Sequence, residues 1–412
     1  GVYNPANVRG LGAWMDAGRG VVNLGDRLAV DNSILDLEDI QSRYSYEARP
    51  TLPLDLSRPL TTDEGKAFQD LIHRLPWERN LSPYFLAGWC LTAQVCGALA
   101  WRPHIWLSGP AGSGKTWILT HIVKPAVGDL GLHVQFETSE AGLRQELMRD
   151  ARPVLFDEAE GETERAANRM QNIMGLMRQA SSENGARIIK GTAGGAAMSF
   201  AIRAQFAFAS ISPGLVQQAD ETRVTPLMVA KRHDPAGFAE IKRLHRELIA
   251  EDFAERLLAR ALVVLPRMAD TVEIFSKAIG DRLGSQRIAD QAGTLLAGAW
   301  LLQRDELPTT EQALAMVAAG DWGEEEITGE ETDDRKLLRR LTQWEVRVDG
   351  EWHPGHTITI GELILLAAGQ GEHRDVSPQS AGQVLRRFGF RVDGSGVAIS
   401  ARAEAIRDRL KG

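Results

Sequence analysis

Eight consecutive residues in this sequence have the types and the spacing of a phosphate-binding loop. They are Gly109, Pro110, Ala111, Gly112, Ser113, Gly114, Lys115 and Thr116, a complete GxxxxGK[ST] pattern. In such a loop the glycines let backbone amides face phosphate oxygens, the lysine neutralises the β- and γ-phosphates, and the hydroxyl binds Mg²⁺. A chain of this composition would contain the pattern by chance roughly 0.01 times. We therefore predict that these residues bind ATP, and that Thr116 also binds Mg²⁺.

An acidic pair follows an apolar run further along the chain. Val154-Leu155-Phe156 directly precedes Asp157 and Glu158. We expect this run to be a strand that delivers Asp157 to the metal ion, while Glu158 polarises the attacking water. The alternative is a strand that ends in a solvated acidic turn, which Glu160 and Glu162 keep open. The phosphate loop upstream favours the catalytic interpretation.

Two polar positions stand next to later apolar runs. Ser210 ends one run, and its hydroxyl, or that of Ser212, is expected either to contact the γ-phosphate or to cap a turn. Arg223 directly precedes the next run, where it could reach the nucleotide of a neighbouring subunit. Such an arginine finger contributes about 10³–10⁵ in rate where it is used. The alternative is a surface ion pair of Arg223 with Asp220 or Glu221.

The elements that must position these residues alternate between short apolar runs and helical segments. Strands are expected at 105–107, 134–136, 154–156, 206–209 and 224–229. Nearly uninterrupted apolar strands between helices indicate a buried parallel sheet with helices on both faces. The fold class is therefore α/β, with an ATPase core at 102–235. A helix is expected to start at Thr116, directly after the phosphate loop.

Other parts of the chain have different patterns. We expect a β-rich accessory region at 1–60, a helical collar at 61–101, a helical lid at 236–325, and a winged-helix domain at 326–412 after an acidic linker. Three predicted helices followed by a β-hairpin at 390–399 give the last assignment. Helical spacing places Phe68, Leu71, Ile72 and Leu75 on one helix face. Met170, Met174 and Met177 are expected in the core.

Composition limits the classes of protein that this chain can belong to. Its 412 residues are 43% hydrophobic and 25% charged, and the net charge is −8. These values exclude wholesale disorder and a uniformly basic nucleic-acid binder, so any DNA contact must be a local patch. The uncharged run 84–101 contains polar and glycine residues and is expected to be a core helix rather than a membrane span.

The cysteines and the N-terminus bear on the cellular compartment. Cys90 and Cys96 form no metal or disulfide pattern, so we expect reduced core residues and a cytoplasmic protein of a bacterial host cell. The chain begins at Gly1 without methionine, basic residues or an apolar stretch. We therefore expect no secretory signal and a piece of a longer protein.

The order of these motifs resembles that of the AAA+ ATPases. The segment between the acidic pair and Phe206 is similar to the superfamily 3 helicase clade, in which an inserted hairpin carries a lysine into a central pore. Here Lys190 stands where the segment 186–203 is expected to turn. The chain also resembles the helicase part of phage and prophage primase–helicase proteins. The segments that carry this resemblance are 24–28, 101–106, 140–145 and 178–182. It departs from superfamily 3 in having Ser210 instead of asparagine, and in its winged-helix tail.

The resemblance implies a Mg²⁺-ATP-driven DNA helicase of phage or mobile-element replication. It implies a homohexameric ring with ATP between subunits, so that Lys115, Thr116, Asp157 and Glu158 act with Arg223 of the next subunit. Single-stranded DNA and forked duplex DNA would be the partners. The resemblance leaves open a primase domain upstream of Gly1 in a longer chain.

Cations near the expected hairpin and in the tail are the candidate DNA contacts. Those around the hairpin are Arg178, Arg187, Lys190 and Arg203. A row of cations in a ring pore would follow a phosphate backbone without reading its sequence, whereas a surface hairpin would only help subunits to pack. Arg386 and Arg387 on the third tail helix would contact duplex DNA, although winged helices also bind proteins.

Two other functions use the same motifs. An AAA+ origin-binding initiator or helicase loader would bind DNA mainly through its winged helix and would not separate strands. A P-loop switch would use the nucleotide to control assembly. The hairpin with Lys190 favours the helicase over both.

Overall fold

The computed structural model describes most of the chain up to Trp322 and short pieces beyond it. The described residues are 7–31, 33–135, 137–157, 164–182, 188–191, 197–200, 202–210, 220, 222–231, 234–322, 346–348, 351–353, 357–358 and 401–402. The chain divides into two compact units, Gly1–Trp322 and Gly323–Gly412.

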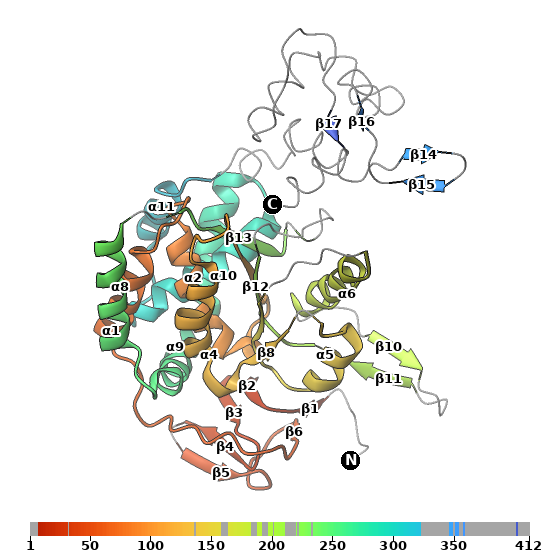
Figure 1. Ribbon diagram of the computed structural model, residues 1–412. Coiled ribbons are helices and arrows are strands. Elements are labelled where there is room, and N and C mark those ends of the chain that lie inside the picture. Colours follow the sequence, from red (N-terminus) through yellow and green to blue (C-terminus); the bar gives the residue numbers. More distant parts are fainter. Residues whose placement is uncertain are drawn as a thin grey trace. The chain divides into compact units, whose positions relative to one another are not determined.

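A five-stranded parallel sheet forms the centre of the first unit (Figure 1). Its strands are β7 (His104–Ser108), β8 (Leu132–Val134), β9 (Val154–Phe156), β12 (Phe206–Ala209) and β13 (Val224–Met228). Their order is β13-β7-β12-β9-β8, and all neighbours are parallel. The predicted parallel sheet is therefore confirmed.

Strand β8 begins two residues earlier than the sequence pattern indicated. His133 interrupts the apolar run at this point, but its neighbours Leu132 and Val134 pair with β9, and the Leu132 amide donates to the Pro153 carbonyl at 2.8 Å. This backbone pairing is non-local, so the apolar pattern alone could not show it. The other four strands start within one residue of the expected positions.

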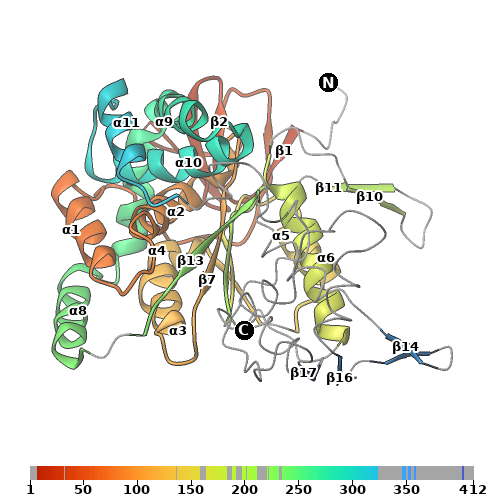
Figure 2. The same ribbon diagram turned by 90° about the horizontal axis from the view of Figure 1, so that it is seen from above.

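Helices cover both faces of the sheet, as Figures 1 and 2 show. They are α2 (Ser82–Gln94), α9 (Phe253–Leu283) and α10 (Gln286–Gln303) on one face, and α5 (Glu140–Leu147) and α6 (Glu164–Ala180) on the other. Successive strand residues point to opposite faces. Ile105 and Leu107 thus join the core with α2, α9 and α10, while Trp106 and Phe208 join the core with α5 and α6. Met170, Met174 and Met177 are buried in the second core, as predicted.

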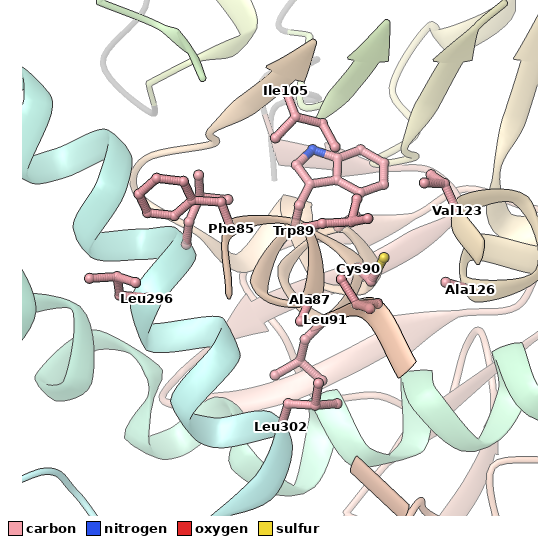
Figure 3. Close-up of a cluster of buried hydrophobic side chains, with 14 of the residues drawn as sticks. Phe85, Ala87, Trp89, Cys90, Leu91, Ile105, Val123, Ala126, Leu296 and Leu302 are labelled. Atoms are coloured by element: carbon pink, nitrogen blue, oxygen red, sulfur yellow. The ribbon is translucent and has the colours of Figure 1, made fainter. Parts of the chain in front are cut away.

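Helix α2 is a buried core helix, as expected for the uncharged run. Figure 3 shows it among apolar side chains of the phosphate-loop strand and α10. Gly88 allows close packing, because a Cβ there would lie 1.8 Å from the Leu295 carbonyl oxygen of α10. Cys90 and Cys96 are free and buried, as expected for two core cysteines. Across the described part of the chain, no helix has both the length and the hydrophobicity that membrane spanning requires.

The N-terminal residues form small sheets, in agreement with the predicted β-rich region. Strands β2 (Gly12–Asp16), β3 (Arg19–Asn23), β4 (Arg27–Val30) and β5 (Ser33–Asp36) form an antiparallel meander, and β1 (Val8–Arg9) pairs in parallel with β6 (Ser45–Tyr46). The meander is attached to the segment before β9: the Leu11 amide donates to Asp150 at 2.9 Å, and the Ala151 amide donates to the Leu11 carbonyl at 2.8 Å.

Three further helices of eight residues or more belong to the described part of the first unit. They are α1 (Thr62–His73), α8 (Pro235–Leu248) and α11 (Thr310–Ala318). The start of α1 has a capping box in which Thr61 and Glu64 each accept from the other's backbone amide. Phe68, Leu71 and Ile72 of its predicted apolar face are buried, and so is Leu75 just after the helix.

The segment between α6 and β12 forms the expected hairpin. Strands β10 (Ile188–Gly191) and β11 (Ala197–Phe200) pair antiparallel as a separate two-stranded sheet. Lys190 lies opposite Met198, one pair before the end of the ladder. The turn at 192–196 and Arg187 lie outside the described residues.

The second unit is described only in four short strands. Strand β14 (Val346–Val348) pairs with β15 (Glu351–His353), and β16 (Thr357–Ile358) pairs with β17 (Ala401–Arg402). The β14–β15 hairpin was missed, although Asp349-Gly350 is a two-residue hairpin turn signal. The predicted winged-helix elements, including Arg386 and Arg387, lie outside the described residues.

Candidate nucleotide site and its neighbours

The phosphate loop connects β7 to α3 (Lys115–Ile118), and its shape depends on glycine. Gly109 has a φ of +147°, and a Cβ there would lie 2.2 Å from the Val229 carbonyl oxygen. Gly112 and Gly114 also have positive φ angles, but no atom lies within 4 Å of an added Cβ at either position. The loop is thus closed at its start against Val229, directly after β13, and open at its middle and end, where a phosphate group has room.

Two side chains of the loop fit an anionic ligand. Lys115 is 8% exposed, and its Nζ donates to the carbonyls of Gly109 and Pro110. Its charge is therefore held at the loop. The Ser113 hydroxyl is buried and has no hydrogen-bond partner among the described residues. A buried polar atom without a partner is rare in native proteins, and a ligand oxygen would satisfy it.

The helix after the loop contains an irregular turn that sequence reasoning missed. Between α3 and α4 (Lys124–Val127), residues Leu119–Val123 form a π-helical turn, a feature frequent at functional sites. Trp117 stacks on His121 with ring centroids 4.9 Å apart, and His245 of α8 contacts both rings. Burial lowers the pKa of His245. The spacing of Trp117 and His121 by four residues indicates that the two rings can pair on a helix, but it gives no sign of the π-helical turn.

Asp157 lies at the same edge of the sheet as the phosphate loop. It directly follows β9, and both strands end at this edge because they are parallel within one sheet. In the described part of the chain, no three acidic, histidine or cysteine side chains gather as a metal site. Mg²⁺ commonly binds through one or two protein ligands plus phosphate oxygens and waters, which Thr116 and Asp157 suit. Glu158 lies outside the described residues.

Ser210 lies between these two strands because β12 is inserted between β7 and β9. Its hydroxyl oxygen accepts a hydrogen bond from the Trp106 indole at 2.6 Å, and its amide donates to the Leu107 carbonyl at 3.0 Å. A serine hydroxyl can accept and donate at the same time, so this bond orients the group without using its proton. Trp106 had the pattern of a core residue, and its polar contact could not be read from the sequence.

Arg223 lies at the opposite end of the sheet from its own phosphate loop. It precedes β13, whose first residue pairs with His104, whereas the loop follows Ser108 at the other end of β7. At about 3.3 Å per residue, the five residues of β7 separate these ends by about 16 Å. Arg223 is therefore badly placed for the nucleotide of its own chain.

The surroundings of Arg223 differ from the expected surface pair. Asp220 is fully buried, and its carboxylate accepts a hydrogen bond from Arg178 of α6. Burial lowers the pKa of Arg223, and the nearby Arg287 and Arg178 lower it further, against the attraction of Asp220. Arg223 thus belongs to a group of three arginines around one buried carboxylate.

Two cations expected along the hairpin are held elsewhere. Arg178 binds Asp220, and the Arg203 guanidinium lies over the Trp14 ring, 5.4 Å from its centroid. Both side chains contact residues that are close in the fold but distant in the sequence. The pattern of charged residues along the sequence could not show these contacts. Lys190 lies in β10, opposite Met198, and not in the turn itself.

Comparisons with known proteins add little to this geometry. No family model matches the chain, and no curated protein matches it. Among solved structures, an active helicase, Cch of SCCmec type IV, gives a TM-score of 0.47 at 12% identity, over 98% of this chain and 80% of that chain. Such an identity transfers no residue roles.

Proposed function

We propose that this chain is an ATP-dependent, ring-forming DNA helicase or translocase of phage or mobile-element replication. The observation that carries the proposal is the placement of Arg223. It lies about 16 Å along the sheet from its own phosphate loop. A hydrolysis site that uses both must therefore form between two subunits, which favours a homo-oligomeric ring, with a hexamer as the proposed size.

Each residue has a defined role in this proposal. The phosphate loop and Lys115 bind the ATP phosphates, while Thr116 and Asp157 hold Mg²⁺, which offsets phosphate charge when bound. Glu158 accepts a proton from the attacking water, and Ser210, oriented by Trp106, donates toward the γ-phosphate. Arg223 of the next subunit stabilises charge on the transferred phosphoryl group.

The β10–β11 hairpin supports DNA as the partner. It is separate from the central sheet, and it carries Lys190 near its end. One lysine per subunit becomes a row of cations in a ring, which suits the backbone of single-stranded DNA. An AAA+ initiator or loader remains the second candidate, because the tail strands belong to a separate unit that could bind duplex DNA.

The test is ATP hydrolysis with and without single-stranded DNA, together with strand displacement from a forked duplex. We expect DNA to stimulate hydrolysis and the fork to be unwound. Stimulation by origin-like duplex without displacement would instead favour the initiator.

Lys190→Ala sharpens this test. For single strands, log K falls with log salt at a slope of about −0.7 per phosphate neutralised. Loss of one lysine in every subunit should flatten the slope by more than one contact and remove DNA-stimulated hydrolysis and unwinding. Lys277→Ala, on an exposed position of α9, is the matched control. Two results together would overturn the proposal of a translocase: Lys190→Ala keeps the wild-type slope of log K against log salt, and deletion of 333–412 abolishes all DNA binding.

A further inference from the structure

We propose that Arg178 and Asp220 are a positioning pair that holds Arg223 in place to act on the neighbouring subunit's nucleotide. This inference rests on the proposed function and adds two residues to it. Neither would touch the nucleotide. Both would act through Arg223.

The pair is anchored in the interior. The Asp220 side chain is 0% exposed and that of Arg178 is 23% exposed. An ionised carboxylate in such a place requires a charged, hydrogen-bonded partner, so Arg178 fixes where the Asp220 segment lies. A surface pair would be screened by solvent and could not hold a segment in this way.

Two backbone hydrogen bonds hold the main chain of Arg223, and one of them is made with Asp220. The Arg223 amide donates to the Asp220 carbonyl at 2.9 Å, and the Arg223 carbonyl accepts from the His104 amide at 3.3 Å. The main chain of Arg223 is thus held on both sides. Displacement of Asp220 would move one of the two supports.

The end of α6 that carries Arg178 is itself fixed to the sheet. The His104 ring hydrogen-bonds to the Met177 carbonyl at 3.2 Å, and the Arg102 amide donates to the Ser181 carbonyl at 2.7 Å. The end of α6 thus lies beside the start of β7, at the end of the sheet opposite the phosphate loop. The 17 residues of α6 span about 25 Å. Arg178 is therefore far from the nucleotide site of its own chain.

Charge also explains why an acidic residue is needed here. Arg178 and Arg287 both disfavour the charge on Arg223, whereas Asp220 favours it. Without the carboxylate, like charges would push the Arg223 side chain away from this corner. With it, the charge of Arg223 is favoured beside two other cations, and its side chain can stay at this corner.

The experiment compares Arg178→Met, Arg178→Lys and Arg243→Met in the full chain. Arg243 forms exposed ion pairs with Glu240 and Glu247 and is the matched control. Misplacement of a catalytic group by about 1 Å can lower rate about 10²-fold. We expect Arg178→Met to lower kcat by about 10²-fold with KM for ATP within about twofold of wild type, as for an interaction made in the transition state. Arg178→Lys, which keeps the charge, should lose less.

Mixing experiments separate positioning in trans from damage to the same subunit. In mixed rings with Lys115→Ala, an Arg178→Met subunit can receive a well-placed Arg223 from its neighbour, so activity should recover as it does for Arg223→Ala. No recovery, or an Arg178→Met rate equal to that of Arg243→Met, would overturn the inference while leaving the proposed function intact. If Arg178→Met does not fold, the same mixture with Arg178→Lys decides between these outcomes. A wild-type chain without ATPase activity would overturn the proposed function, and the inference with it.

Discussion

The two ends of strand β7 are built in different ways. At one end, the phosphate loop is a run of eight adjacent residues whose shape depends on local backbone geometry. At the other end, the Arg223 corner is assembled from β7, α6 and the segment before β13, through contacts between residues far apart in sequence. In the proposed function, the loop binds the nucleotide of its own chain, whereas the corner acts on the nucleotide of another subunit. Binding and turnover should therefore be lost separately.

The first prediction tests this separation at the corner and has the largest expected effect. Arg223→Ala should lower turnover by about 10³–10⁵, because a finger of this kind stabilises transition-state charge. Nucleotide affinity should stay nearly unchanged, since the phosphate loop is intact. ATPase assays and fluorescent-nucleotide titrations measure the two quantities. Mixing with Lys115→Ala, which should itself lose nucleotide binding, should restore activity; no recovery in a confirmed mixed ring would contradict action in trans.

The second prediction concerns the acidic pair Asp157 and Glu158, which follows β9 at the same end of the sheet as the phosphate loop. Glu158→Gln should lower turnover by about 10²–10⁴, the usual contribution of a general base. ATP binding and assembly should persist, because Asp157 and the loop remain. Binding and hydrolysis measured on the same preparation check this. Hydrolysis at the wild-type rate would show that Glu158 does not activate water.

The third prediction breaks the loop through its backbone alone. Gly109→Ala combines a left-handed φ with a Cβ 2.2 Å from the Val229 carbonyl oxygen, so it should destabilise the fold by about 3 kcal/mol. Gly112→Ala is the matched control, with a φ of +76° but open space around its Cβ. It should cost about 1 kcal/mol. Thermal unfolding without nucleotide measures both, and equal costs would show that contact with β13 does not shape the loop.

The same contrast explains what could be predicted from the sequence. The phosphate loop and the parallel strands follow from local patterns, and the sheet has the expected strands, with β8 shifted by two residues. The hairpin with Lys190 was expected from the resemblance to superfamily 3 helicases, and β10 and β11 form it. The Trp106–Ser210 bond and the Arg178–Asp220 pair could not be predicted, because each joins residues more than 40 positions apart. From the sequence, Arg178 was a candidate DNA contact. In the fold it pairs with Asp220 instead.

The last prediction uses pH to test how firmly the Arg223 corner is packed. The His104 ring is fully buried against α6, and its Nδ1 accepts from the Phe206 amide at 3.0 Å. Burial, assisted by the positive charge of Arg102, lowers the pKa of His104 from 6.5 to about 3. The folded protein therefore keeps this ring neutral at pH values where the unfolded chain binds a proton.

The free energy of unfolding should fall for this reason as pH drops below 6.5, and the loss should level off near pH 3, where the folded state also takes up the proton. At pH 5 the contribution is about 2 kcal/mol. His104→Gln removes the titrating group, so its stability relative to wild type should improve by this amount between pH 8 and pH 5, whatever its cost at pH 8. Urea unfolding at both pH values measures the difference. An unchanged difference would mean that the His104 ring is protonated in the folded state, and that the corner is open enough to accommodate the charge.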